Sequence, residues 1–279
     1  MTHTADQSVL LGLTACWTAS ARAHESQRAD RLFDDPWAEA LAGQVGAEWL
    51  AQRTADSLTP IVLRTRFFDD FLQQITSQHN LRQIVLVAAG LDTRAFRLAW
   101  SEHTCVFELD QPAVLDHKQQ VLDRAGALPR CDRRAIGVDL AAAWQSSLLA
   151  AGYEPTRPSG WLLEGLSFYL PDEAIVRLLD TVTDLAAPGS WLGLDVINRL
   201  TLTSPLTRPW IEMQAALGAP WIGTLDEPVE FLAARGWAAS LTQAGQPEVN
   251  HGRWRLPVIP VNLPTLPHNW LVTAHKVLA

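Results

Sequence analysis

The chain has 279 residues, of which 48% are hydrophobic and 19% are charged, and its formal net charge is −8. This composition is typical of a globular protein that buries a full core, and it excludes a disordered chain. The acidic surplus disfavours nucleic acid and anionic membranes as partners, and without a leader-like N-terminus or a run of about 18 apolar residues we expect neither secretion nor a membrane span.

Residues 1–80 carry apolar positions at helical spacing, with a turn at Asp34–Pro36. After Pro60 an apolar residue recurs every four positions, which places these residues on one face of a helix. They are Leu63, Phe67, Phe71 and Ile75. We therefore expect an N-terminal helical cap over residues 1–80.

After residue 80, short apolar strands alternate with helical segments. The first strand, Gln83–Ala89, is typical of a strand buried on both faces of a parallel sheet, and it ends at Gly90. The later predicted strands are Cys105–Leu109, Arg134–Val138, Trp161–Glu164 and Trp191–Ile197. The helical segments run from Val114 to a stop at Gly126, over Ala141–Ala151, and onward from Pro171 as first helical residue. This alternation predicts an α/β core over residues 81–197 with a doubly wound, mostly parallel Rossmann-like sheet.

The alternation breaks at Asn198–Phe231, where prolines interrupt mixed apolar and polar residues. We expect an inserted helical lid here, over residues 198–232. The strand-like segments Trp237–Leu241 and Trp270–Val277 lie on either side of the proline-rich connection Pro257–Pro267. They predict an antiparallel sheet edge in residues 233–279, so that residues 1–279 form a single domain.

Glycine and acidic residues follow four of the predicted strands. In open parallel sheets, ligands bind outside the carboxyl ends of the strands. Gly90 lets the backbone turn sharply, and Asp110, twenty residues later, can accept hydrogen bonds from both hydroxyls of a ribose. Asp139 and Glu164 end the third and fourth strands. Each acid alone could cap a helix or face solvent, but together they predict a nucleoside site. Glycine-rich phosphate-binding motifs are absent, which favours an adenosine ligand without phosphates.

The segment VAAGLDTRAFRL, Val87–Leu98, resembles the signature of the leucine carboxyl methyltransferase family, a branch of the class I S-adenosylmethionine (SAM)-dependent methyltransferases. Further blocks resemble the family in the same order, and they extend the likeness over about residues 20 to 200. These blocks are Arg22–Glu25 with Phe33–Pro36, Arg64–Leu72, Phe107–Asp110, Val138–Leu140 and Glu164–Leu170. The resemblance implies that the chain binds SAM as cofactor and transfers its methyl group.

The resemblance also implies roles at the methionine end of the cofactor. Arg64 would pair with the methionine carboxylate, with Arg22 as a second cationic partner, because a guanidinium suits a carboxylate. Glu164 would lie near the same end. The family usually has glycine at the position of Ala88, whose methyl group is expected to narrow the approach of the cofactor.

At the adenosine end, the resemblance implies that Asp110 holds the ribose hydroxyls. Asp139 would accept a hydrogen bond from the adenine amino group, and Leu140 would line the adenine ring. Gly90 would let the backbone approach the cofactor.

For the acceptor, we expect a pocket formed by Trp210 and Trp221 of the lid, together with Tyr169 and Arg253. Methyl transfer depends mainly on positioning, and a carboxylate acceptor is ionised at neutral pH and needs no general base, whereas a phenol usually does. The motif blocks contain no convincing general base. His251 is a weak candidate, because it is more simply explained as an ordinary histidine in a loop. We therefore expect a methyl ester of a small molecule, in bacterial specialised metabolism.

Three alternatives remain open from the sequence. A phenol or another hydroxyl could be the acceptor. The protein could also bind SAM without transferring its methyl group, an alternative that Ala88 leaves open. Finally, the spacing of Gly90 and Asp110 is compatible with an NAD-dependent oxidoreductase. No metal-ligand spacing is present, and three cysteines without pairing spacing favour a reducing cytoplasm. The expected partner is a small-molecule acceptor, and a homodimer is left open.

Overall fold

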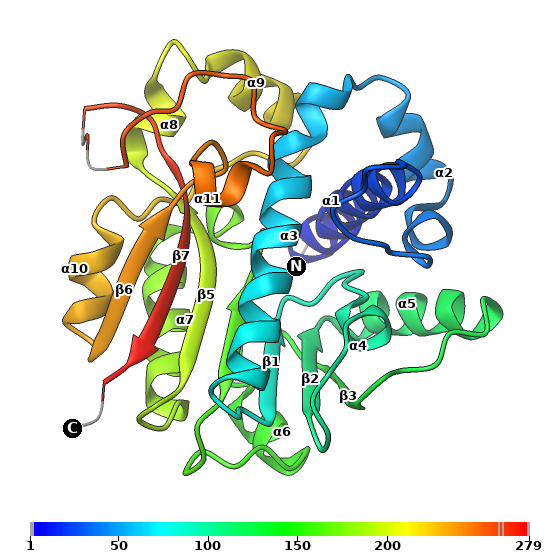
Figure 1. The fold of residues 1–279 in the computed structure, drawn as a ribbon, viewed down its shortest axis with the longest axis vertical. Helices are drawn as coiled ribbons and strands as arrows, with labels where there is room; N and C mark the ends of the chain where they lie inside the picture. The colour runs from blue at the N-terminus through cyan, green and yellow to red at the C-terminus, as the bar shows by residue number, and fades with distance from the viewer. Residues whose placement is uncertain (1–2, 262, 264, 278–279) are drawn as a thin grey trace.

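The computed structural model describes residues 3–261, 263 and 265–277, with only the backbone for residues 3–11 and 13. Its sheet has seven strands in the order β3-β2-β1-β4-β5-β7-β6 (Figure 1). The bounds are β1 Gln83–Val87, β2 Cys105–Asp110, β3 Asp132–Gly137, β4 Gly160–Leu163, β5 Trp191–Ile197, β6 Trp237–Thr242 and β7 Asn269–Lys276. Strands β1 to β5 pair in parallel, and β7 lies antiparallel between β5 and β6. The expected mostly parallel α/β sheet with an antiparallel edge is confirmed.

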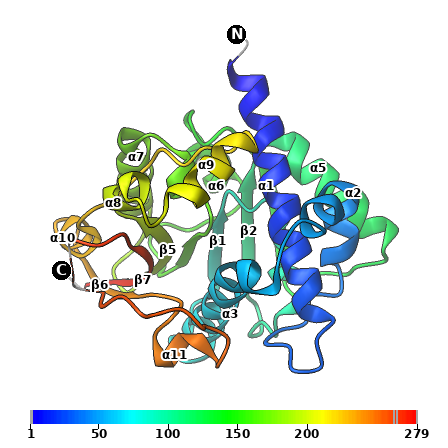
Figure 2. The ribbon, with the colours of Figure 1, turned by 90° about the horizontal axis from the view of Figure 1, so that it is seen from above.

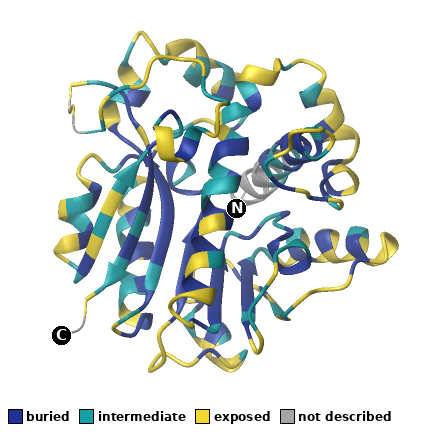
Figure 3. Cartoon of the chain, viewed as in Figure 1, coloured by how far each residue is buried: buried dark blue, intermediate teal, exposed yellow. Residues whose placement is uncertain are grey.

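Helices cover both faces of the sheet because alternate side chains of each strand point to opposite faces. Val85 and Phe107 pack on the face covered by α6, α7 and α10, whereas Ile84 and Val106 pack on the face covered by α3 to α5. The bounds are α3 Ala55–Ser77, α4 Arg94–Arg97, α5 Pro112–Arg124, α6 Gln145–Ala150, α7 Asp172–Leu185 and α10 Pro228–Ala233. The central strands are buried and the outer faces of the helices are exposed (Figure 3).

The remaining helices gather around one edge of the sheet. Viewed from above, the ends of β1 and β2 lie near α1 and α9 (Figure 2). The bounds are α1 His3–Ser26, α2 Ala38–Leu50, the 3-10 helix η1 Ser167–Tyr169, α8 Arg199–Thr203, α9 Arg208–Ala216 and α11 Pro247–Asn250. None of the described helices combines the length and the apolar character needed to cross a membrane.

Several element ends differ from the sequence prediction. Strand β1 stops at Val87 because Ala88 turns to a φ of 54° and leaves the extended conformation. Pro171 precedes α7 as its N-cap, with a ψ of 147°, and is not its first helical residue. Helix α6 begins at Gln145, later than expected, after a turn in which Asp139 Oδ1 accepts the Ala141 N–H. Residues 262 and 264 of the expected connection, and residues 1–2 and 278–279 of the expected domain, lie outside the described residues.

Candidate functional site

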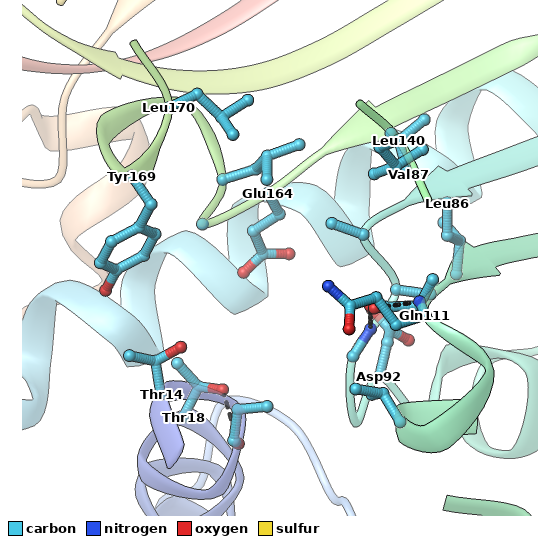
Figure 4. Close-up of a pocket in the computed structure, with 18 of the residues that line it drawn as sticks. Thr14, Thr18, Leu86, Val87, Asp92, Gln111, Leu140, Glu164, Tyr169 and Leu170 are labelled. Carbon is cyan, nitrogen blue, oxygen red and sulfur yellow. Dashed lines mark hydrogen bonds between the residues drawn. The ribbon is translucent and has the colours of Figure 1, made fainter. Parts of the chain in front are cut away.

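A cavity of about 650 Å³ lies at the carboxyl edge of the sheet, under α1, α3 and α9. It is large enough for a cofactor-sized ligand. The structure brings most of the predicted site residues to its wall, and Figure 4 shows part of the lining. These residues are Arg22, Arg64, Ala88, Gly90, Asp110, Asp139, Leu140, Glu164, Tyr169, Trp210 and Trp221.

The turn after β1 carries two residues in the left-handed region. Ala88 has a φ of 54° and Gly90 a φ of 47°. The left-handed region suits glycine but strains alanine, because the Cβ atom approaches the following carbonyl oxygen. The turn thus presents its backbone to the cavity at some cost in stability at Ala88.

The carboxylate of Asp110 is fixed by two backbone N–H groups. Gly90 N–H donates to Oδ2 at 2.6 Å, and Gln111 N–H donates to Oδ1 at 2.7 Å. Burial raises the pKa of Asp110, although these two N–H groups act to lower it. Each carboxylate oxygen can accept a second hydrogen bond. Asp110 therefore offers two preoriented acceptors, as a pair of ribose hydroxyls requires.

Arg64 holds two carboxylates together at the other end of the cavity. Its Nε lies 3.0 Å from Glu164 Oε1, and its Nη1 lies 2.8 Å from Asp195 Oδ2. Asp195 is fully buried in β5 and also accepts the Gly165 N–H at 2.7 Å. These pairs use two of the five N–H groups of the guanidinium, and among the described residues Nη2 has no hydrogen-bond partner, so this nitrogen can be offered to a ligand.

A buried network of charges supports Glu164 from behind. Arg94 Nη1 lies 2.8 Å from Glu164 Oε2, and Arg94 also pairs with Asp92 and, at 2.7 Å, with Asp69. Asp69 is shared with Arg97 at 2.6 Å. Burial raises the pKa of Asp92, but the nearby positive charges of Arg94, Lys118 and Arg97 together outweigh burial, and the pKa falls to about 2. The network gives each of these carboxylates a paired counter-charge and fixes its position, as burial of a charge requires.

Arg22 lines the cavity, but its guanidinium is hydrogen-bonded to other residues of the protein. Its Nε lies 2.8 Å from Asp35 Oδ2, and its Nη2 donates to the Leu91 carbonyl at 2.7 Å. These bonds tie α1 to the turn after β1. In this arrangement Arg22 supports the turn after β1, and it has fewer N–H groups available for a methionine carboxylate than the sequence suggests.

The lining fits a ligand that carries an ammonium group and a ribose. Glu164 Oε2 is buried and has no well-directed hydrogen bond, although Arg94 lies close to it. A buried carboxylate oxygen that has an ion-pair partner but no directed hydrogen bond can still accept one from a cationic donor. Glu164 can thus accept from an ammonium while Arg64 Nη2 donates to a carboxylate, and Asp110 binds the ribose. No three His, Cys, Asp or Glu side chains in the described part of the chain are arranged to hold a metal ion.

Aromatic residues surround the cavity beyond Glu164; we call this part the aromatic chamber. Trp17 and Trp49 stack at 5.8 Å with an angle of 8° between their planes. Trp210 and Trp221 meet edge to face at 5.9 Å and 70°. Tyr169 also lines the chamber (Figure 4), and burial raises the pKa of its phenol, which therefore stays protonated at neutral pH. Such walls favour a planar or apolar ligand.

The structure places two predicted residues outside the cavity. Arg253 Nη2 lies 3.0 Å from Glu25 Oε1, which ties the connection after α11 to the end of α1. His251 is an exposed C-cap residue of α11 with a φ of 46°. Because Arg253 is committed to Glu25 and His251 faces solvent, neither residue contacts a ligand in the cavity.

Sequence reasoning assigned no role to several residues of the site. Asp195 was the most visible of them, because a single acid within the apolar strand WLGLDVI signals a buried partner. Trp17, Trp49 and Gln214 come from helices far apart in the chain, and no local pattern connects them with the predicted strand ends.

Comparison with known proteins gives one family and a consistent group of relatives. Residues 15–183 match the model of the family described as leucine carboxyl methyltransferase. A protein of Streptomyces coelicolor is 40% identical over 257 residues, which cover 86% of this chain and 87% of the relative. A protein of Mycolicibacterium gilvum is 36% identical over 269 residues, covering 88% and 89%. Both carry the name "Putative S-adenosyl-L-methionine-dependent methyltransferase".

Solved structures agree with the fold. A DUF574 family protein from Streptomyces avermitilis matches with a TM-score of 0.60 at 15% identity, over 92% of this chain and 96% of that one. A methyltransferase-like structure from Thermobifida fusca matches with a TM-score of 0.59 at 18% identity, over 92% and 94%. At these identities the likeness concerns the fold.

Proposed function

This chain belongs to the leucine carboxyl methyltransferase family and is a SAM-dependent methyltransferase, and we propose that it methylates a carboxylate oxygen of a small molecule. The family assignment replaces the oxidoreductase and the non-transferring alternatives. The chemical class of the acceptor has to be inferred from the residues that line the cavity.

The proposal depends on one observation, the lack of a general base. No histidine, lysine or cysteine is among the described residues that line the cavity. Its carboxylates are engaged: Asp92 and Glu164 pair with Arg94, Asp110 accepts two backbone N–H groups, and Asp139 caps Ala141. A carboxylate acceptor is already ionised at neutral pH and needs no base, whereas an alcohol or phenol would have to lose its proton.

The site residues can then be given roles that the family resemblance suggests. Asp110 binds the ribose, Asp139 and Leu140 bind the adenine, and Glu164 with Arg64 Nη2 binds the ammonium and carboxylate of the methionine end. SAM, held by these residues, would supply an electrophilic methyl group for transfer to the acceptor oxygen and would leave as S-adenosylhomocysteine. The protein accelerates this step by holding the two reactants in line and excluding water.

The aromatic chamber supports a small molecule over a protein tail or a nucleic acid. Its walls come from α1, α2, η1 and α9 and from Trp221, and the net charge of −8 repels phosphate backbones. We place Trp210, Trp221 and Tyr169 against the acceptor. The neutral phenol of Tyr169 can donate a hydrogen bond to a carboxylate acceptor.

The test separates esters from ethers. The enzyme is incubated with methyl-labelled SAM and a panel of carboxylic acids and phenols, and the products are treated with mild alkali. A methyl ester releases its label as methanol under these conditions, whereas a methyl ether keeps it. We expect alkali-labile label, with Asp110→Ala as a control that removes transfer. Label that resists alkali would refute the carboxylate proposal and favour a hydroxyl acceptor.

A further inference from the structure

The helix α9 has one buried residue, and that residue is polar. Gln214 is 7% exposed and lines the cavity. Amphipathic helices usually bury apolar side chains against the body of a protein. A buried amide on the inner face of a lid therefore calls for an explanation.

The side chain of Gln214 has no hydrogen-bond partner among the residues that the structure describes. Its Oε1 is buried without a hydrogen bond, and no described residue bonds to its amide nitrogen. Leaving a buried polar group unpaired is costly, and such groups occur mainly where a ligand or ordered water completes the bond. Because the side chain lines the chamber, a ligand there can supply that bond.

The surroundings of Gln214 indicate what kind of ligand group this is. Trp49, which is 8% exposed, lines the same chamber, and its Nε1 is also without a hydrogen bond. Among the described lining residues from α1, α2, α3 and α9, the cations are Arg22 and Arg64, and both are paired with carboxylates. No unpaired charge from these helices is therefore left to bind a second anionic group.

We propose that Gln214 determines acceptor specificity by binding an uncharged hydroxyl group on an aromatic carboxylic acid held between the tryptophans. A hydroxyl can both donate to the amide oxygen and accept from the amide nitrogen, so it satisfies either orientation of the glutamine. The stacked and edge-to-face tryptophans suit a planar ring system. This inference rests on the proposed carboxylate methylation and adds the substrate class and the residue that selects it.

The test uses three acids of matched shape. They are 2-naphthoic acid, 6-hydroxy-2-naphthoic acid and naphthalene-2,6-dicarboxylic acid, with mono- and tricyclic analogues to cover other ring sizes. Binding to the wild type is measured by calorimetry with S-adenosylhomocysteine present, and transfer is measured with labelled SAM. We expect a hydroxy acid to bind about tenfold more tightly than its unsubstituted partner, and the dicarboxylate to bind more weakly than the hydroxy acid.

Two variants show whether Gln214 is responsible. Gln214→Met keeps the length of the side chain and removes its polar atoms, so the preference for the hydroxy acid should fall to about one. Its melting temperature should not fall, because an unpaired polar group has been removed, and its affinity for S-adenosylhomocysteine should be unchanged. The matched control is Gln145→Met, since Gln145 lines the same cavity from α6. This control should keep the full wild-type preference.

The outcomes separate the two proposals. A Gln214→Met variant that still prefers the hydroxy acid by the wild-type margin would overturn the role of Gln214. Esterification of aliphatic acids without binding of any arene acid would overturn the aromatic hydroxy acid class while the carboxylate proposal stands. Methylation of the arene hydroxyl in place of the carboxylate would overturn the carboxylate proposal and, with it, the inference that depends on it.

Discussion

Replacing Arg64 by methionine should destabilise the protein and weaken cofactor binding through two separate losses. The guanidinium pairs with Asp195 at 2.8 Å and with Glu164 at 3.0 Å. Asp195 is fully buried, and its other hydrogen bond comes from the Gly165 N–H. Arg64→Met therefore leaves a buried carboxylate without its counter-charge.

The magnitude follows from the burial of the pair. Removing one partner of a buried ion pair costs about 3–5 kcal/mol, which lowers the melting temperature by roughly 6–20 °C for a chain of this size. Losing the Nη2 contact to the methionine carboxylate should cost a further ~1.5–3 kcal/mol of binding, or roughly 10- to 150-fold in Kd. The matched control is Arg66→Met on the same helix. Its pair with Asp70 is exposed and its Nη1 donates to the Leu32 carbonyl at 2.6 Å, so the variant should cost about 1–2 kcal/mol.

The assay is urea unfolding of the single variants and of Arg64→Met combined with Asp195→Asn. The second change removes the stranded charge, so the double variant should be at least about 2 kcal/mol more stable than the sum of the single effects. Calorimetry with SAM gives the binding loss independently of stability.

The pH dependence of stability gives a further check, because the direction of the change can be stated in advance. Burial already raises the pKa of Asp195 in the wild type, although Arg64 lowers it, and loss of Arg64 raises it further. A carboxyl group with a folded pKa above its unfolded value of about 4 binds more protons in the folded state. The stability of Arg64→Met should therefore rise as the pH falls from 7 toward 4, relative to the wild type. Additive single effects, or a loss no larger than that of Arg66→Met, would refute this account of Arg64.

Three further results are expected. Ala88→Gly should relieve the backbone strain at a φ of 54°, stabilise the protein by about 0.5–1 kcal/mol and tighten SAM binding. Ala89→Gly, the control, should destabilise the protein. Equal melting temperatures for the two variants would count against strain at Ala88. Asp110→Ala should remove measurable SAM binding in calorimetry, while circular dichroism shows that the fold is intact. Because burial raises the pKa of Asp110, the SAM affinity of the wild type should begin to fall at a pH above the usual pKa range of aspartate. Asp110→Asn should not show this pH dependence. Trp210→Ala should lower turnover at least tenfold and leave S-adenosylhomocysteine affinity unchanged; a parallel fall in both would show that the lid also holds the cofactor.

The alternation of strands and helices was readable from the sequence because burial on both faces demands apolar strands. Strand β5 was predicted with its observed bounds, Trp191–Ile197, since its apolar run is closed by clear turn residues. Strand β1 was predicted two residues too long, because Ala88 looks like a strand residue and only the turn beyond it forces a positive φ. Local propensity could not show that strain, which the surrounding contacts impose.

The sequence by itself determined which residues stand at the strand ends, because a polar residue after an apolar strand is a local signal. Gly90, Asp110 and Glu164 were found this way, and the parallel sheet brings them to one cavity. Only the tertiary structure decided what each side chain is left to offer. Arg64 and Arg22 looked alike as cations, yet Arg64 pairs with the two carboxylates of Glu164 and Asp195, whereas Arg22 is bonded to Asp35 and to the turn after β1. Partners from distant parts of the chain make this difference, since a side chain's remaining hydrogen-bonding capacity depends on every group packed around it.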